Sequence, residues 1–195
     1  MFGTLALGYF GLGCTVWGKS DGRLNWLTKS FFWPIRLGHE WSRKHYRKQS
    51  APWDALADSV LIGSQPDEEE ARALVKSGVT AVLDLTSEYE RPSAFASINY
   101  LNIPVLDLTA PSSVHLREMA VFIEREQQGG KVYIHCKAGY SRTAAAAGAW
   151  LLATGRATSA EDACRILNER RPGMVIRPEI RSALDHFETL TGTWN

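Results

Sequence analysis

Residues 135–143 have the sequence His135-Cys136-Lys137-Ala138-Gly139-Tyr140-Ser141-Arg142-Thr143, and this stretch decides the fold. The residues before it, 131–134, are Lys-Val-Tyr-Ile, a run typical of a buried strand. The residues after it, 144–152, are four alanines followed by Gly-Ala-Trp-Leu-Leu, and they predict a helix. The sequence therefore predicts a strand, a tight loop and a helix in direct succession.

This strand–loop–helix unit is suited to binding an anion next to a reactive thiol. The backbone N–H groups of the loop and the positive end of the helix dipole both point at the mouth of the loop. A thiol placed there, that of Cys136, is stabilised as the thiolate, which is the nucleophilic form. Arg142 offers a planar fork that matches two phosphate oxygens. The spacing thus predicts a nucleophile beside a phosphate-binding arginine.

The loop has two other interpretations. Buried free cysteines are usually inert, in which case Gly139 would only mark a turn and Arg142 would be a solvated helix residue. A nucleotide-binding P-loop would end in Gly-Lys-Ser/Thr, which is absent here. The whole pattern Cys-x-x-Gly-x-x-Arg-Thr between a strand and a helix is far more specific than a lone cysteine, so it favours catalysis.

From about residue 51 the chain alternates between strand-like and helix-like segments. Strands are predicted at 59–63, 79–85, 100–104 and 131–135, and helices at 67–77, 114–128, 142–153, 159–170 and 178–190. This alternation predicts an α/β fold with a central, mostly parallel sheet covered by helices on both faces. The loop would lie at the carboxyl ends of the strands, where such sheets bind ligands.

The first 50 residues differ from the rest in charge and aromatic content. They carry eight basic and two acidic residues, whereas residues 51–195 carry 14 basic and 19 acidic ones. Five of the seven tryptophans lie in residues 1–53. We therefore predict a hydrophobic and basic N-terminal segment, residues 1–50, followed by a catalytic domain, residues 51–195.

Two stretches of the N-terminal segment predict contact with a membrane. Residues 2–17 contain no charge, but a helix of that length rises only about 24 Å, whereas a full span needs roughly 20 apolar residues. Farther on, Trp33, Leu37, Trp41 and His45 recur every fourth residue beside basic side chains, which suits an anionic headgroup interface. An amphipathic helix packed on the catalytic domain is the alternative for this second stretch.

The sequence therefore predicts a helical, membrane-associated appendage that binds an anionic membrane surface. Because the basic residues follow the uncharged stretch, the positive-inside rule places the catalytic domain on the cytoplasmic side. Cys14, Cys136 and Cys164 form an odd, sparse set that argues against a disulfide framework. Cys164 lies in a helical pattern, either as a core residue or as a redox partner of Cys136. No metal, cofactor or nucleic-acid partner is predicted.

Residues 135–143 resemble the signature of the dual-specificity branch of the cysteine-dependent protein tyrosine phosphatase superfamily. The resemblance covers about residues 54–190 and implies hydrolysis of phosphate monoesters through a phosphocysteine intermediate on Cys136. It implies that Arg142 binds the phosphoryl group and stabilises the charge of its transition state. Thr143 would donate a hydrogen bond to the sulfur, and His135 would orient the loop and keep the thiol pKa low. The loop residues expected around the substrate phosphate are Lys137, Ala138, Gly139, Tyr140 and Ser141.

This family takes its general acid from a separate loop upstream of the cysteine. The apolar run 103–106 leads into Asp107, and Pro111 then breaks the chain into a loop. We therefore predict that Asp107 protonates the leaving group and then serves as base for the hydrolytic water. The alternative is that Asp107 caps the helix that starts near Ser112. Asp84, at the end of another predicted strand, is a rival acid to which we assign a structural role.

Two stretches, 132–139 and 171–178, resemble phosphatidylglycerophosphate phosphatase-like members of mitochondrial and bacterial type. The resemblance implies a phospholipid monoester as substrate, such as phosphatidylglycerophosphate. Arg177 would add positive charge near its phosphate, unless it forms a surface salt bridge. Phosphoinositide phosphatases carry a second lysine in the loop where this chain has Tyr140, which argues against multiply phosphorylated inositol lipids. Dual-specificity dephosphorylation of proteins is the alternative function, followed by a phosphate-binding pseudophosphatase and a rhodanese-type sulfurtransferase.

Overall fold

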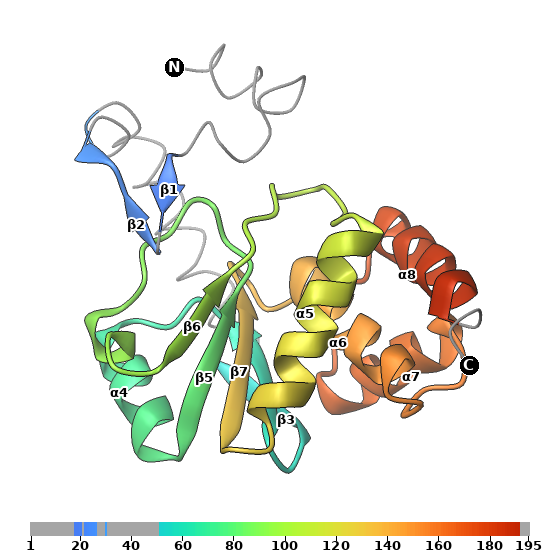
Figure 1. The fold of residues 1–195 in the computed structure, drawn as a ribbon, viewed down its shortest axis with the longest axis horizontal. Coiled ribbons are helices and arrows are strands. Elements are labelled where there is room, and N and C mark those ends of the chain that lie inside the picture. The colour runs from blue at the N-terminus through green and yellow to red at the C-terminus, as the bar shows by residue number, and fades with distance from the viewer. Residues whose placement is uncertain (1–17, 21, 27–29, 31–50, 192–195) are drawn as a thin grey trace.

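The computed structural model describes residues 18–20, 22–26, 30 and 51–191 (Figure 1). Both stretches predicted to contact a membrane, 2–17 and 33–48, lie outside the described residues, so the membrane-associated appendage stays a prediction. Within the described part of the chain, none of the helices combines the length and the apolar character needed to cross a bilayer.

A five-stranded sheet with the order β3-β4-β7-β5-β6 lies at the centre of the domain (Figure 1). Four strands run parallel, namely β4 (Val60–Ser64), β7 (Lys131–Cys136), β5 (Val79–Asp84) and β6 (Asn99–Asn102). The edge strand β3 (Trp53–Ala57) pairs antiparallel with β4. The α/β fold with a mostly parallel sheet is therefore confirmed. The sheet is mixed because β3, which the sequence did not predict, runs antiparallel.

Helices cover both faces of the sheet, as predicted. One face carries α5 (Ser113–Glu126), α6 (Ser141–Ala153), α7 (Ala160–Arg170) and α8 (Pro178–Thr191), and the other carries α4 (Glu68–Lys76) and the short 3-10 helix η3 (Ser93–Phe95) (Figure 1). Successive residues of β4 show the division: Ile62 packs in the larger core under α5–α8, while Leu61 packs in the smaller core with α4. This alternation is what strand geometry requires of a sheet buried on both faces.

The helix that follows the loop, α6, runs through the core. Its residues from Arg142 to Leu152 are all buried. The small side chains of its alanine run allow the other helices to approach closely, and a Cβ at Gly148 would lie 2.8 Å from Leu184 of α8. Near its end, Trp150 donates a hydrogen bond of 2.9 Å to Glu124 of α5. Packing on several sides fixes α6, and with it the loop at its start.

A small antiparallel hairpin lies beyond the carboxyl ends of β5 and β6 (Figure 1). It consists of β1 (Lys19–Ser20) and β2 (Arg23–Leu24), neither of which was predicted. Lys19 is one of the eight basic residues of the N-terminal segment. The structure buries its side chain in an ion pair with Asp84, so Lys19 is not available to an anionic surface.

Candidate active site

The predicted loop joins the end of β7 to the start of α6. Cys136 is the last residue of β7 and is buried. No side chain caps α6, so the N–H groups of its first turn are left for an anion. Gly139 has a φ of 72°, and a Cβ there would lie 2.5 Å from the backbone of Gly63. Both the conformation and the close approach require glycine at this position.

Arg142 is held rigidly beneath the loop. Its guanidinium donates hydrogen bonds of 2.8 and 3.1 Å to the two carboxylate oxygens of Glu88, and a third of 3.0 Å to the carbonyl of Val105. Burial disfavours the charge of Arg142, but the ion pair with Glu88 outweighs this cost and raises the pKa of the guanidinium above its usual value. Such a bidentate pair fixes the plane of the fork before any ligand binds.

Asp107 lies beside the same arginine. Its side chain is 52% exposed, and its Oδ1 is 3.5 Å from Nη2 of Arg142. The structure therefore brings the predicted acid and the predicted phosphate ligand together. The cap of α5 is Ser112, whose hydroxyl accepts a 3.3 Å hydrogen bond from the N–H of His115. The alternative role of Asp107 as that cap is therefore wrong.

Asp84, the rival acid, is enclosed by other partners. Its carboxylate accepts hydrogen bonds of 2.5 Å from Lys19 and from Tyr100, and two of 2.7 Å from the N–H and hydroxyl of Thr86. Burial alone would raise the pKa of Asp84, but Lys19 and His135 lower it to about 2. A carboxylate held in this way stays ionised and engaged at neutral pH. Asp107, by contrast, is half exposed and has Arg142 beside it.

His135 precedes the cysteine and is fully buried. Its ring stacks on Tyr133, with 5.4 Å between centroids, and its Nδ1 is 3.8 Å from Oδ1 of Asp84. Burial lowers the pKa of His135 to about 4, although Asp84 acts in the opposite direction. The imidazole is therefore neutral at pH 7. His135 therefore acts on the loop through its packing and position and not through a positive charge.

The remaining predicted residues lie around the loop or behind it. Thr143 is buried on the first turn of α6, and its hydroxyl has no hydrogen-bond partner within the described residues. Ser141 donates a 2.7 Å hydrogen bond to the carbonyl of Val175. Lys137, Ala138 and Tyr140 are each partly buried.

Two other predicted positions, Arg177 and Cys164, have partners or packing of their own. Arg177 is exposed and lies 3.8 Å from the carboxylate of Glu179, which is the surface salt bridge named as its alternative. Cys164 packs into the core on α7, where burial raises the pKa of its thiol. A raised pKa disfavours the thiolate, which agrees with the core interpretation of Cys164.

Two residues that hold the loop were given no role by the sequence analysis. Glu88 orients Arg142, and its sequence signal is weak: an acidic residue shortly after a parallel strand, where ligand-binding residues gather. Arg171 is buried and donates hydrogen bonds of 3.1 Å to the carbonyls of Gly139 and Ala51, and it also pairs with Asp54. It thereby ties the loop to β3, which the sequence analysis missed.

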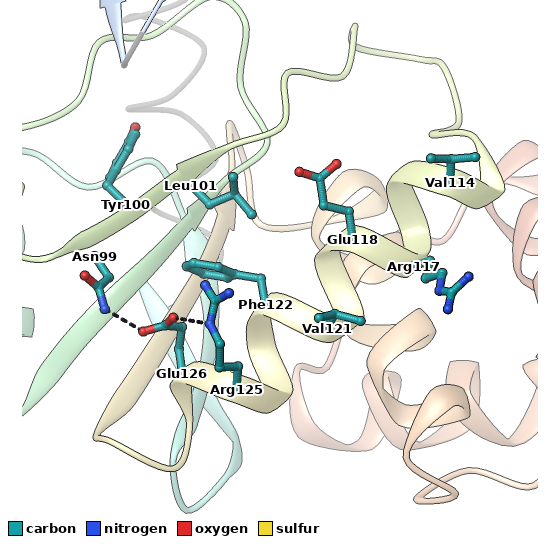
Figure 2. Close-up of a pocket in the computed structure, with 10 residues that line it drawn as sticks. All are labelled: Asn99, Tyr100, Leu101, Val114, Arg117, Glu118, Val121, Phe122, Arg125 and Glu126. Atoms are coloured by element: carbon teal, nitrogen blue, oxygen red, sulfur yellow. Dashed lines mark hydrogen bonds and ion pairs between the residues drawn. The ribbon is translucent and has the colours of Figure 1, made fainter.

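A separate groove of about 670 Å³ lies between β6 and α5 (Figure 2). Leu101 and Phe122 line it, and Glu126 of α5 joins its two walls by accepting a 2.6 Å hydrogen bond from Asn99 of β6. Glu126 also accepts a 2.7 Å hydrogen bond from its neighbour Arg125. None of the predicted site residues lines this groove. The predicted catalytic residues therefore lie at the loop and not in this groove.

Comparison with known proteins agrees with this geometry. The dual specificity phosphatase catalytic domain matches residues 60–189, more than half of the chain. The chain belongs to this family. A dual specificity phosphatase is a cysteine-dependent phosphatase, so the enzyme class predicted from residues 135–143 is confirmed.

Several relatives of this dual specificity phosphatase are named as phosphatases of the lipid phosphatidylglycerophosphate. It is 31% identical to phosphatidylglycerophosphate phosphatase PTPMT2 of Arabidopsis thaliana, over 82% of this chain and 72% of that protein. It is 29% identical to phosphatidylglycerophosphatase and protein-tyrosine phosphatase 1 of Homo sapiens, over 83% of this chain and 86% of that one. Other relatives are longer, and the chain spans 36% of Arabidopsis thaliana PTPMT1.

A solved structure supports the same family. Tk-PTP in its active form is 30% identical to this dual specificity phosphatase and superposes with a TM-score of 0.64. The match covers 71% of this chain and 97% of Tk-PTP. The catalytic domain therefore has the cysteine phosphatase fold, with a mixed central sheet flanked by helices.

Proposed function

We propose that this phosphatase hydrolyses a phospholipid monoester, such as phosphatidylglycerophosphate, through a phosphocysteine intermediate on Cys136. The contact of Arg142 with both Glu88 and Asp107 carries the phosphatase chemistry, because it brings the phosphate ligand, its support and the acid together. The relatives named for phosphatidylglycerophosphate support the lipid substrate. Dual-specificity dephosphorylation of proteins remains the alternative, since the human relative bears both activities in its name.

In the first step, the thiolate of Cys136 attacks phosphorus and the bond to the leaving oxygen breaks. Arg142 and the N–H groups at the start of α6 bind the phosphoryl oxygens and stabilise their growing charge. Asp107 faces Arg142 in the free chain. Asp107 acts as the general acid: it gives its proton to the leaving alkoxide and becomes a carboxylate.

In the second step, water attacks the phosphocysteine and releases phosphate. Asp107, now a carboxylate, takes a proton from the water as the new oxygen–phosphorus bond forms. The sulfur–phosphorus bond breaks and Cys136 leaves as the thiolate. The hydroxyl of Thr143, which has no other partner within the described residues, is free to donate a hydrogen bond to that sulfur.

Two exposed apolar side chains support a lipid substrate. Leu108 follows Asp107 and is 53% exposed, and Val175, whose carbonyl is bound by Ser141 of the loop, is 54% exposed. They lie on the two segments that flank the loop. An apolar rim around a phosphate-binding site suits an ester whose alcohol carries acyl chains.

The N-terminal segment would keep the catalytic domain close to such a substrate. We propose that residues 1–50, apart from Lys19, which pairs with Asp84, bind an anionic membrane surface and that residues 51–195 act on the cytoplasmic side. The uncharged stretch 2–17 and the basic, tryptophan-rich stretch 33–48 support this proposal.

The substrate class is tested by comparing phosphatidylglycerophosphate with phosphotyrosine peptides in the same mixed micelles. We expect kcat/KM to favour the lipid by roughly tenfold or more, because burying acyl methylenes contributes about 0.8 kcal/mol each. Leu108→Asn should reduce activity on the lipid while sparing a soluble aryl phosphate. Val121→Asn, which changes an exposed valine of α5, is the matched control. A preference for the peptides would overturn the lipid assignment and leave the phosphocysteine chemistry intact.

The assignment of the acid is tested by the leaving group. Asp107→Asn should lower kcat on an alkyl phosphate by roughly 10²- to 10⁴-fold. The loss should be much smaller on an activated aryl phosphate, whose leaving group needs little protonation. Asp84→Asn should affect both substrates equally, because Asp84 is buried among structural partners. If the dependence on the leaving group follows Asp84 instead, the acid is not Asp107.

A further inference from the structure

The β1–β2 hairpin places a buried cation behind the catalytic loop. The Lys19 side chain is 1% exposed, and its Nζ donates hydrogen bonds of 2.5 Å to Asp84 and of 2.8 Å to the carbonyl of Thr86. A buried lysine is rare, because removing an ammonium group from water is costly unless it is paired and hydrogen-bonded. The site for Lys19 is therefore a specific one, built from three acceptors that include the Thr86 hydroxyl.

Lys19 is connected to the nucleophile through two side chains. Asp84 is the last residue of β5, and it stands in register with His135 of the neighbouring strand β7. Tyr100 of β6 donates to the same carboxylate oxygen as Lys19. His135 in turn precedes Cys136 directly. The position of Asp84 therefore affects the position of the β7 backbone at His135 and Cys136.

The hairpin also holds the segment that supports Arg142. The N–H of Arg91 donates a 2.7 Å hydrogen bond to the carbonyl of Gly22, and the N–H of Leu24 donates one of 3.3 Å to Glu90. Glu88, which fixes the guanidinium of Arg142, lies between these contacts and the Lys19–Thr86 contact. The segment 86–91 is therefore fastened to the hairpin at both of its ends.

We propose that Lys19 is a positioning residue for the phosphatase reaction. By neutralising Asp84 and binding Thr86, it fixes the end of β5 and the segment that follows. His135 then stays beside Asp84, and Glu88 keeps Arg142 aimed at the phosphate. Through Lys19, the hairpin therefore supports the active site, although it precedes the predicted catalytic domain. The proposal does not depend on a lipid substrate.

The test uses the full chain carrying Lys19→Met and a soluble aryl phosphate without lipid. We expect kcat/KM to fall roughly ten- to hundredfold, since small misplacements of catalytic groups have effects of this size. The inhibition constant of orthovanadate, which occupies the phosphate position, should rise by a similar factor. Arg23→Met changes an exposed basic residue of the same hairpin and should alter neither value.

The vanadate constant separates positioning from mere stability, because it does not depend on how much of the enzyme is folded. A variant that only destabilised the fold would lose apparent kcat but keep its KM and its vanadate constant. If Lys19→Met fails to fold, the double variant Lys19→Met/Asp84→Asn leaves no unpaired buried charge and is measured instead. The proposal is overturned if the folded variant keeps both constants within twofold of the parent chain. A failed lipid assay would not affect this result.

Discussion

Replacement of Cys136 by serine is expected to lower hydrolysis of a soluble aryl phosphate by roughly 10⁴-fold or more. A cysteine thiolate is a strong nucleophile, whereas a serine hydroxyl in the same place is a weak one until a base removes its proton. A serine nucleophile needs a general base, and the neighbouring His135 is buried and already in contact with Asp84. The measurement is steady-state hydrolysis in excess chelator, with the parent chain assayed alongside.

The matched control is Cys164→Ser, which changes a thiol buried in the core on α7. This variant should keep its activity per folded molecule and lose some stability, because it buries a hydroxyl in an apolar site. The parent chain should stay fully active in chelator. Activity that survives Cys136→Ser, or that disappears when metal is removed, would exclude the phosphocysteine mechanism.

The arrangement of the loop was predictable because its signals are local. The strand β7, the tight turn at Gly139 and the alanine-rich α6 follow one another in the sequence, and each has its own pattern of side chains. The starts of two helices follow from equally local signals. Asp67 is the N-cap of α4 and forms a capping box, and Ser112 is the N-cap of α5. Interactions within a few residues need no knowledge of the rest of the fold.

The supports of the site were missed because they depend on residues far apart in the chain. Glu88 meets Arg142 from 54 positions away, and Lys19 meets Asp84 from 65 positions away. Before folding, Glu88 is one acidic residue among many, and Lys19 is one member of a basic segment. The edge strand β3 was missed for a related reason. Leu56 is its only fully buried residue, and the strand exists because β4 offers it a partner.

The two carboxylates near Arg142 have different relations to it. Glu88 is buried and binds the guanidinium through both oxygens, whereas Asp107 is half exposed and approaches it at 3.5 Å. A ligand can therefore displace Asp107 without disturbing Glu88. Because Glu88 neutralises Arg142, attraction of the phosphate does not rest on a free charge. It rests on the direction of the guanidinium N–H groups and on the N–H groups at the start of α6.

This reasoning predicts that Arg142→Lys lowers kcat/KM by roughly 10³-fold, although the charge is kept. An ammonium group has three donors around a point charge and cannot span both oxygens of Glu88, the Val105 carbonyl and two phosphate oxygens at once. The orthovanadate inhibition constant should rise together with the loss of kcat/KM. Arg170→Lys, at an exposed arginine of α7, is the matched control and should behave as the parent chain.

Thermal unfolding of Arg142→Lys shows whether a loss of kcat/KM comes from the active site or from a loss of stability. Lysine still neutralises Glu88, so we expect the variant to fold, with its deficit confined to phosphate binding and turnover. A loss of less than tenfold in the folded variant would mean that charge alone binds the phosphoryl group. In that case the bidentate pair with Glu88 would serve the stability of the fold, and its orientation of Arg142 would contribute little to catalysis. A full loss with normal folding would instead show that the direction of the guanidinium, set by Glu88, is what the active site requires.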